Sequence, residues 1–138
     1  MPFKACVKRG LLGLGLMGIV ANVPAMAGDV YVIAHPSVNL TLTELRDVYL
    51  GEKQFAGSIK LTPVDNVAVQ SDFLTKAIHM DASKYASMWI KKGFRGGLTA
   101  PPTKTGDAEV ISFVKNTPGA VGYLSAPPPQ GIKQLHKY

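Results

Sequence analysis

Residues 116–125 read NTPGAVGYLS, and this stretch decides the fold more than any other. A turn formed by Thr117, Pro118 and Gly119 leads into the apolar run AVGYL at 120–124. Since apolar residues follow one another here without alternation, we expect a strand that is buried on both faces. Such a strand indicates an α/β domain in which helices surround a small sheet.

The second informative stretch is LTLTELRDVYLGE at 40–52. Thr41 and Glu44 have the spacing of a capping box, which predicts a helix that begins at this point. Gly51 can adopt the left-handed conformation that closes a helix. The apolar residues on one stripe of this helix are Leu42, Leu45, Val48 and Tyr49.

Outward from these stretches the chain alternates strands with helices, about four helices in all. Strands are expected at 29–34, 59–64, 120–124 and 132–135, with the last one peripheral. Further helices are expected at 69–79, from a cap at Asp81 to an end at Gly93, and at 107–115, with an irregular loop at 94–105. The predicted core contains Leu45, Val48, Phe73, Ile78, Trp89, Val110, Val114 and Val121.

The first 27 residues have the layout of a secretory signal peptide. Three positive charges come before an apolar stretch at 11–20, and the pattern A-M-A ends at Ala27, just before Gly28. An uncleaved anchor helix is the alternative, but the apolar run is shorter than the roughly 20 residues that a membrane span needs. We therefore expect cleavage between Ala27 and Gly28, export to the periplasm, and a single domain at 28–138 that does not insert into a membrane.

Charge and cysteine content exclude several classes of function. The net charge of +6 falls to +3 once Lys4, Lys8 and Arg9 leave with the signal segment. The remaining cations include one adjacent pair, Lys91 and Lys92, and no arginine-rich run, so nucleic-acid binding is not expected. The single cysteine lies within the first 27 residues, which excludes thiol chemistry in the exported domain.

No enzymatic or metal-binding motif is present in the sequence. His35, His79 and His136 share no motif, and we interpret them as loop or surface groups. We therefore expect a protein that is not an enzyme and that uses no metal or cofactor.

Small polar residues precede several predicted helices, and a helix N-terminus attracts anions through its free N–H groups and its dipole. Ordinary capping is the alternative interpretation at each position, and Asp72 and Asp107 in first turns would repel an anion. The candidate oxyanion-binding residues are Gln70, Ser71, Lys104, Thr105 and Gly106.

From Val32 to Leu135 the sequence resembles the periplasmic phosphate-binding-protein-like domain of ABC importers, the phosphate substrate-binding family. The features that carry the resemblance are LTLTELRDVYLGE at 40–52, PVD at 63–65, Trp89 followed by Phe94 and Gly97, and NTPGAVGYLS at 116–125. The resemblance implies a single lobe of a type II periplasmic-binding-protein-like fold. Full-length relatives have two lobes and trap their anion between them, whereas 28–138 provides one.

The sequence differs from the family pattern at the stretch that binds phosphate in the family. The family has an arginine followed shortly by Ser-Gly-Thr, whereas residues 65–71 read DNVAVQS. Asp65 places a negative charge where the family has a positive one, and Gln70 and Ser71 are the polar groups that remain to donate hydrogen bonds.

Two functions therefore remain open. The resemblance implies an exported single-lobe protein that binds a small, phosphate-like oxyanion or presents its lobe to a transporter or sensor protein. The alternative is an interaction or assembly module that has lost its anion site. A homodimer of such lobes could form a cleft between two lobes across its interface.

Overall fold

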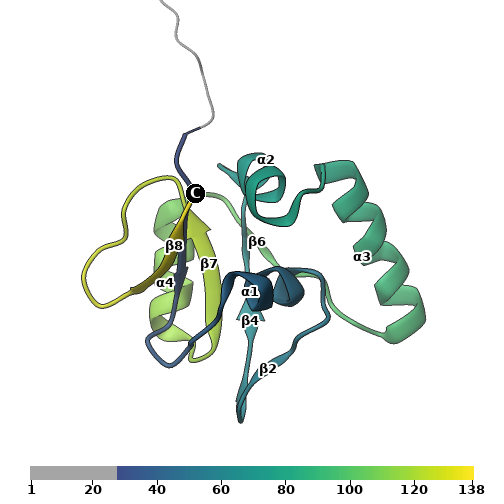
Figure 1. Ribbon diagram of the computed structural model, residues 1–138, viewed down its shortest axis with the longest axis horizontal. Coiled ribbons are helices and arrows are strands. Elements are labelled where there is room, and N and C mark those ends of the chain that lie inside the picture. The colour runs from purple at the N-terminus through teal and green to yellow at the C-terminus, as the bar shows by residue number, and fades with distance from the viewer. Residues whose placement is uncertain (1–27) are drawn as a thin grey trace, which may run out of the picture.

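The computed structural model describes residues 28–138, so the expected signal peptide and its cleavage after Ala27 lie outside the described residues. The centre of the fold is a four-stranded sheet with the order β4-β7-β1-β8 (Figure 1). Both β7 and β8 run antiparallel to β1, and β4 runs parallel to β7. These strands are β1 (Tyr31–Ala34), β4 (Thr62–Pro63), β7 (Ala120–Leu124) and β8 (Lys133–Lys137).

Strand β7 is buried along its whole length, which confirms the expectation from its apolar run. Its alternating side chains enter two hydrophobic clusters, one on each face of the sheet. Val121 and Tyr123 lie in the larger cluster, and Ala120 and Leu124 lie in the smaller one. At Gly122 the helix that contains Val110 comes so close that an added Cβ would lie 2.7 Å from a Val110 methyl carbon.

Helices cover both faces of the sheet, and this arrangement confirms the mixed α/β class. One face packs against α1 (Leu42–Tyr49), α2 (Gln70–Phe73), its π-helical continuation η1 (Leu74–Ile78), and α3 (Ala82–Gly96). The other face packs against α4 (Asp107–Asn116), which lies behind β7 in Figure 1. All eight residues predicted for the core are buried. Among the described residues, no helix has the length and apolar character needed to cross a membrane.

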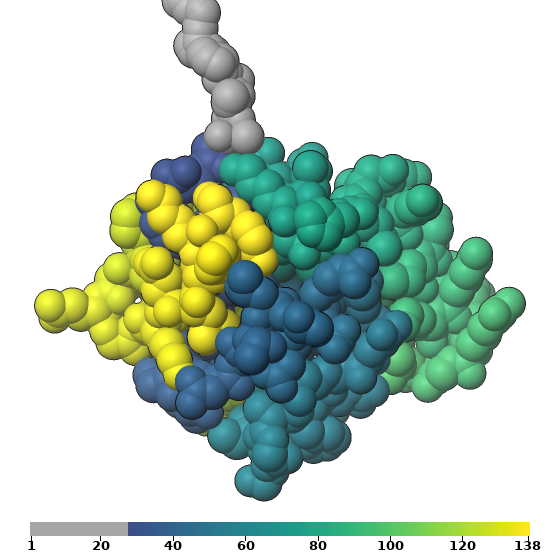
Figure 2. All heavy atoms as spheres, in the orientation of Figure 1, coloured from purple at the N-terminus to yellow at the C-terminus, as the bar shows by residue number. Residues whose placement is uncertain are grey.

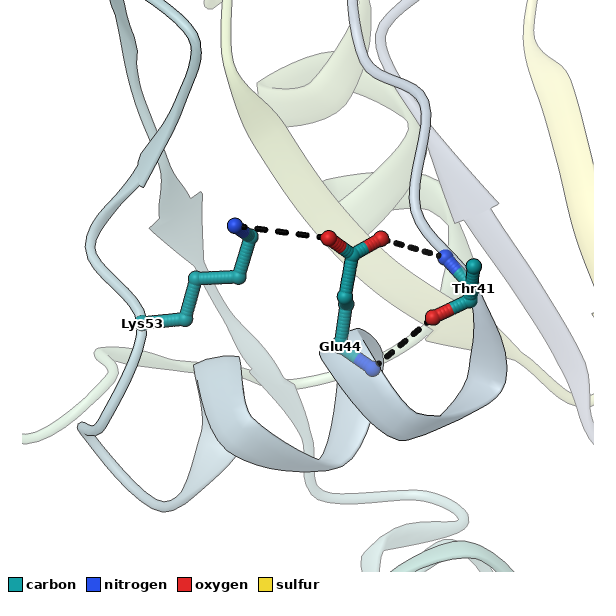
Figure 3. Close-up of polar contacts among 3 residues, drawn as sticks. All are labelled: Thr41, Glu44 and Lys53. Carbon is teal, nitrogen blue, oxygen red and sulfur yellow. Dashed lines mark hydrogen bonds and ion pairs between the residues drawn. The ribbon is translucent and has the colours of Figure 1, made fainter.

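The capping box predicted at Thr41 is present and begins α1 (Figure 3). The Glu44 N–H donates to the Thr41 hydroxyl at 3.1 Å, and the Thr41 N–H donates to the Glu44 carboxylate at 2.9 Å. The second Glu44 oxygen lies 3.4 Å from the Lys53 ammonium. The Thr41 N–H, together with Lys53, lowers the pKa of the Glu44 carboxyl. Gly51, just past the helix, has the expected positive φ of 78°.

The predicted end of α3 at Gly93 is wrong. Asp81 caps the helix as expected, with the Lys84 N–H donating to its carboxylate at 2.8 Å. The helix then continues through Gly93 to Gly96 and stops at Gly97, which has a φ of 66°. Glycine weakens a helix without forbidding it, and Trp89, one turn before Gly93, is buried against the rest of the fold. The expected loop at 94–105 is also interrupted by a short strand, β6 (Thr103–Lys104).

The single strand predicted at 59–64 is two short strands, and a third strand follows directly, because the chain changes its neighbour twice. Strand β3 (Ile59–Lys60) forms a hairpin with β2 (Phe55–Ala56), which was not predicted. The chain next joins β7 as β4, and the Val64 N–H donates to the Val121 carbonyl at 2.8 Å. The following N–H, that of Asp65, donates to the Pro102 carbonyl at 2.8 Å, and β5 (Asp65–Asn66) pairs in parallel with β6.

The remaining boundaries shift by small amounts. The first and last strands begin two and one residues later than predicted, at Tyr31 and Lys133. The helix predicted at 69–79 begins at Gln70, widens into the π-helical turn η1 after Phe73, and stops at His79, whose φ is 61°.

Candidate functional site

The candidate site lies at the edge where the parallel strands β5 and β6 end. Their register pairs Asp65 with Thr103 and Asn66 with Lys104, so both strands finish side by side. Beyond this point one strand leads into α2 and the other into α4. Loops that follow the carboxyl ends of parallel strands are the usual ligand-binding place in an open α/β sheet.

A network of polar side chains already occupies the start of α4. The buried Asn66 amide donates to an Asp107 carboxylate oxygen at 2.8 Å and to the Tyr123 carbonyl at 3.0 Å. The Ser125 N–H and hydroxyl donate to the other Asp107 oxygen at 3.1 Å and 2.9 Å. Asp107 therefore supplies the negative charge that the N-terminus of a helix favours.

Three of the predicted oxyanion-binding residues lie at the end of β6 or between it and α4, and two of them have side-chain partners. The Thr105 hydroxyl donates to the Glu109 carboxylate at 2.8 Å, and this bond lowers the pKa of Glu109. The Lys104 ammonium lies 5.0 Å from the centre of the Phe113 ring, so it is directed along α4. Gly106 precedes α4 in an extended conformation, with no side chain capping the helix.

The other two predicted residues, Gln70 and Ser71, begin α2. Ser71 is exposed, and Gln70 is half-buried. Burial raises the pKa of the neighbouring Asp65 carboxyl, and the Gln70 side chain is one of the groups that oppose this rise. The Asp72 carboxylate lies in the same first turn. This half of the edge therefore offers a hydroxyl and an amide between two carboxylates.

Asp65 was expected only as a negative charge in the stretch 65–71, and its burial is the principal feature that the sequence interpretation missed. Its carboxylate is 2% exposed and accepts hydrogen bonds from the Tyr123 hydroxyl at 2.7 Å and from the Tyr85 hydroxyl at 3.0 Å. Burial raises the pKa of Asp65, and the two hydroxyls oppose this shift. The pKa values of both tyrosines are raised, first by their own burial and then by the nearby carboxylate.

Aromatic packing surrounds the cluster formed by Asp65, Tyr85 and Tyr123. The rings of Phe73 and Tyr123 are stacked, with centres 3.9 Å apart. Beside them, the Tyr49 hydroxyl donates to the Val64 carbonyl at 2.8 Å and also lies 3.2 Å from the Val121 carbonyl oxygen. The cluster therefore ties together α1, β5, α3 and β7.

The histidines do not meet in the fold. Nδ1 of His35 lies 2.8 Å from the Ser37 hydroxyl, whereas His136 packs edge-on against Tyr138 with ring centres 4.5 Å apart. His79 is exposed at the end of η1. Within residues 28–138, no three His, Cys, Asp or Glu side chains are grouped so that they could hold a metal ion.

Comparison with known proteins gives similarity at the level of structure alone. No family model matches the chain, and no curated protein matches its sequence. Among solved structures, the chain is similar to the crystal structure of an ABC-type phosphate transport receptor from Vibrio cholerae, with 14% sequence identity and a TM-score of 0.48. The alignment covers 80% of this chain and 47% of the receptor chain, so this chain spans about half the length of that receptor.

Proposed function

We propose that the protein is a non-catalytic binding module, exported to the periplasm, that holds a small phosphate-like oxyanion weakly where β5 and β6 end. The observation that carries the proposal is the parallel register of these two strands, which brings the starts of α2 and α4 to one edge. Backbone N–H groups near Gln70, Ser71 and Gly106 would bind the oxygens of the anion, and Lys104 would supply a cation.

A non-catalytic role is supported by the state of Asp65. A general acid or base must reach the proton that it transfers. Both Asp65 oxygens instead accept hydrogen bonds from tyrosine hydroxyls within the core, at 2.7 Å and 3.0 Å. This carboxylate therefore serves to join β5, α3 and β7.

The affinity for an oxyanion should be low, because the protein's own groups compete for the same donors. An anion would compete with Glu109 for the Thr105 hydroxyl and would draw Lys104 away from Phe113. None of the five candidate residues is an arginine, so the bidentate contact that selects oxyanions by shape is missing. Binding should also weaken with salt, since an exposed charge is screened within about 8 Å at physiological ionic strength.

The test is a phosphate titration followed by amide NMR. We expect shifts that cluster at Gln70, Ser71 and Thr105 and that diminish in Lys104→Ala. Lys115→Ala is the matched control, because Lys115 is an exposed cation in the last turn of α4. This control should leave the shifts unchanged. Shifts confined to Lys91, Lys92 and Arg95 would contradict the proposal and would indicate diffuse counterion binding.

The second candidate is an interaction module that docks on a transporter or sensor protein or pairs with its own copy. The observation that favours it is the outer side of α3, where Ile90 is 62% exposed and Phe94 is 88% exposed. This helix forms one end of the molecule, at the right of Figure 1. Exposed aromatic residues of this kind are enriched in protein interfaces.

Light scattering after size exclusion, over a range of protein concentrations, tests self-pairing. A dimer that dissociates in Phe94→Ser would support it. Leu42→Ser, which removes an exposed leucine from α1, is the control and should leave the dimer intact. A monomer at every concentration would exclude the homodimer.

A further inference from the structure

A groove of about 600 Å³ lies on the molecular surface beside α3. Apolar side chains of Met80, Met88 and Leu98 line it, and they are partly buried against the main hydrophobic cluster. In Figure 2, α3 and the segment after it form the green end of the molecule, at the right. The groove shares no residue with the edge where β5 and β6 end.

The charges around this groove have one sign. Its lining contains no carboxylate. Its four cations are Lys84, Lys91, Lys92 and Arg95. Lys92 lies 3.8 Å from the Glu52 carboxylate. Lys91 and Arg95 are one helical turn apart, and like charges at this spacing repel each other. An anion placed between them would offset the repulsion and gain a charge-assisted hydrogen bond from the guanidinium.

The apolar part of the groove is suited to an alkyl chain. Methionine side chains are unbranched and polarizable, so they adapt to ligands of irregular shape. Because all three apolar side chains already contact the main cluster, a bound chain would extend the protein core at this surface.

We propose that this groove binds a single-chain anionic amphiphile, with its alkyl chain on Met80, Met88 and Leu98 and its carboxylate between Lys91 and Arg95. The volume of the groove is that of a small-molecule site, for which about 300 to 1,000 Å³ is usual. Nine residues line it, whereas a protein partner typically engages about 20 to 30 residues on each side.

A bilayer surface fits the geometry less well than a free amphiphile. The strongly exposed apolar side chains of α3, Ile90 and Phe94, would be the ones to enter a bilayer, but neither lines the groove. The residues that line the groove are instead three less exposed apolar side chains and four cations.

The experiment titrates sodium decanoate, below its micelle concentration, into the full chain with ¹³C-methyl-labelled methionine. The Met80 and Met88 methyl signals should shift together with the amides of Lys91 and Arg95. Two reference ligands separate the contributions: acetate carries the head without the chain, and decanol carries the chain without the charge. Both should bind at least about tenfold more weakly, since each lacks one of the two contacts.

Charge variants locate the head group. Lys91→Gln with Arg95→Gln should weaken decanoate binding about tenfold, the loss expected from one charge-assisted contact. Lys115→Gln with Lys137→Gln removes the same charge at exposed positions elsewhere and should change nothing. These are surface substitutions, and unchanged methyl signals of the ligand-free variants would verify their fold.

Four results would overturn the proposal. Equal affinity for decanoate and acetate would indicate counterion binding alone. The same conclusion would follow if decanoate shifted signals elsewhere in the protein and not those of Met80 and Met88. Cosedimentation with anionic phosphatidylglycerol vesicles, without any response to decanoate, would assign the surface to a membrane. A synthetic acidic amphipathic peptide that displaces decanoate and binds more tightly would assign the groove to a protein segment.

Discussion

Asp65 is the one carboxylate that is buried within residues 28–138, and its partners explain how the fold tolerates it. An isolated charge would be costly to bury, whereas here each carboxylate oxygen accepts a tyrosine O–H. No local sequence pattern indicates this cluster, because Tyr85 and Tyr123 lie 20 and 58 residues away from Asp65. Such a partnership depends on how α3 and β7 pack, which periodicity and caps do not reveal.

The raised pKa of Asp65 predicts a pH dependence of stability. A carboxyl whose pKa is higher in the folded state binds more protons when folded, so stability declines as pH rises from about 4 toward the folded pKa. Relative to Asp65→Asn, the free energy of unfolding of the wild type should therefore fall over this range and then level off. Urea unfolding at a series of pH values measures it.

Glu44 provides the control of opposite sign. Its pKa is lowered in the folded state, so the wild type should gain stability relative to Glu44→Gln as pH rises through the same acidic range. Parallel pH profiles for the two variants would contradict the assignment of Asp65 as a carboxyl with a raised pKa.

Among substitutions on α3, we expect the largest loss of stability when the Trp89 side chain is removed. Its side chain is 7% exposed, lies against Gly51, and donates from its indole N–H to the Tyr49 carbonyl at 3.2 Å. Trp89→Ala should lower the free energy of unfolding by about 3 to 5 kcal/mol, as expected for a buried aromatic residue. Ile90→Ala, at the exposed neighbouring position, should change it by less than about 0.5 kcal/mol. Denaturant unfolding gives both values, and equal effects would contradict the burial of Trp89.

At the scale of elements, the continuation of α3 through Gly93 gives a prediction about helix propensity. A Cβ at Gly93 would meet only the Leu98 carbonyl, at 3.6 Å, so alanine fits there. Gly93→Ala should therefore raise the free energy of unfolding by about 0.5 to 1 kcal/mol. Gly97→Ala should lower it, because alanine is strained at the φ of 66° that ends the helix. Thermal or urea unfolding of the pair measures both, and the same sign in both variants would contradict the helix end at Gly97.

Local signals were sufficient for elements that are determined by nearby residues. The capping box at Thr41, the cap at Asp81 and the turn before β7 act within a few residues, and each was found from the sequence. The error at 59–64 has a different cause, since the chain from 59 to 66 pairs first with β2, then with β7 and then with β6. A sequence pattern indicates extended backbone, but it does not show that the neighbour changes.

The candidate oxyanion site shows the same division between local and tertiary information. The small polar residues before α2 and α4 were visible in the sequence. Their competitors were only partly visible: Asp107 could be expected in the first turn of α4, but its bonds to Asn66 and Ser125 depend on the packing of three segments. The direction of Lys104 toward Phe113 likewise follows from the position of α4 on the sheet.

At the scale of the whole molecule, both ends of the described chain meet in the same sheet region. The Tyr138 N–H donates to the Val30 carbonyl at 2.9 Å, and the Val30 N–H donates to the Tyr138 carbonyl at 3.3 Å. The Lys76 ammonium also donates to the Gly28 carbonyl at 2.8 Å.

Residues 28–138 form two hydrophobic clusters of their own, so we expect this domain to fold without residues 1–27. The pattern A-M-A at 25–27 predicts that the exported protein begins at Gly28. Signal peptidases require a small residue immediately before the cut, so Ala27→Leu should block cleavage, whereas Met26→Leu, at the variable middle position, should permit it. The measurement is the intact mass of the protein recovered from the periplasm. A mass that retains residues 1–27 in the wild type would contradict the cleavage and would favour the anchored alternative. Lys4, Lys8 and Arg9 leave with the segment, so the net charge of the exported chain should be +3 instead of +6. Its isoelectric point, measured by isoelectric focusing, should be lower than that of the full chain.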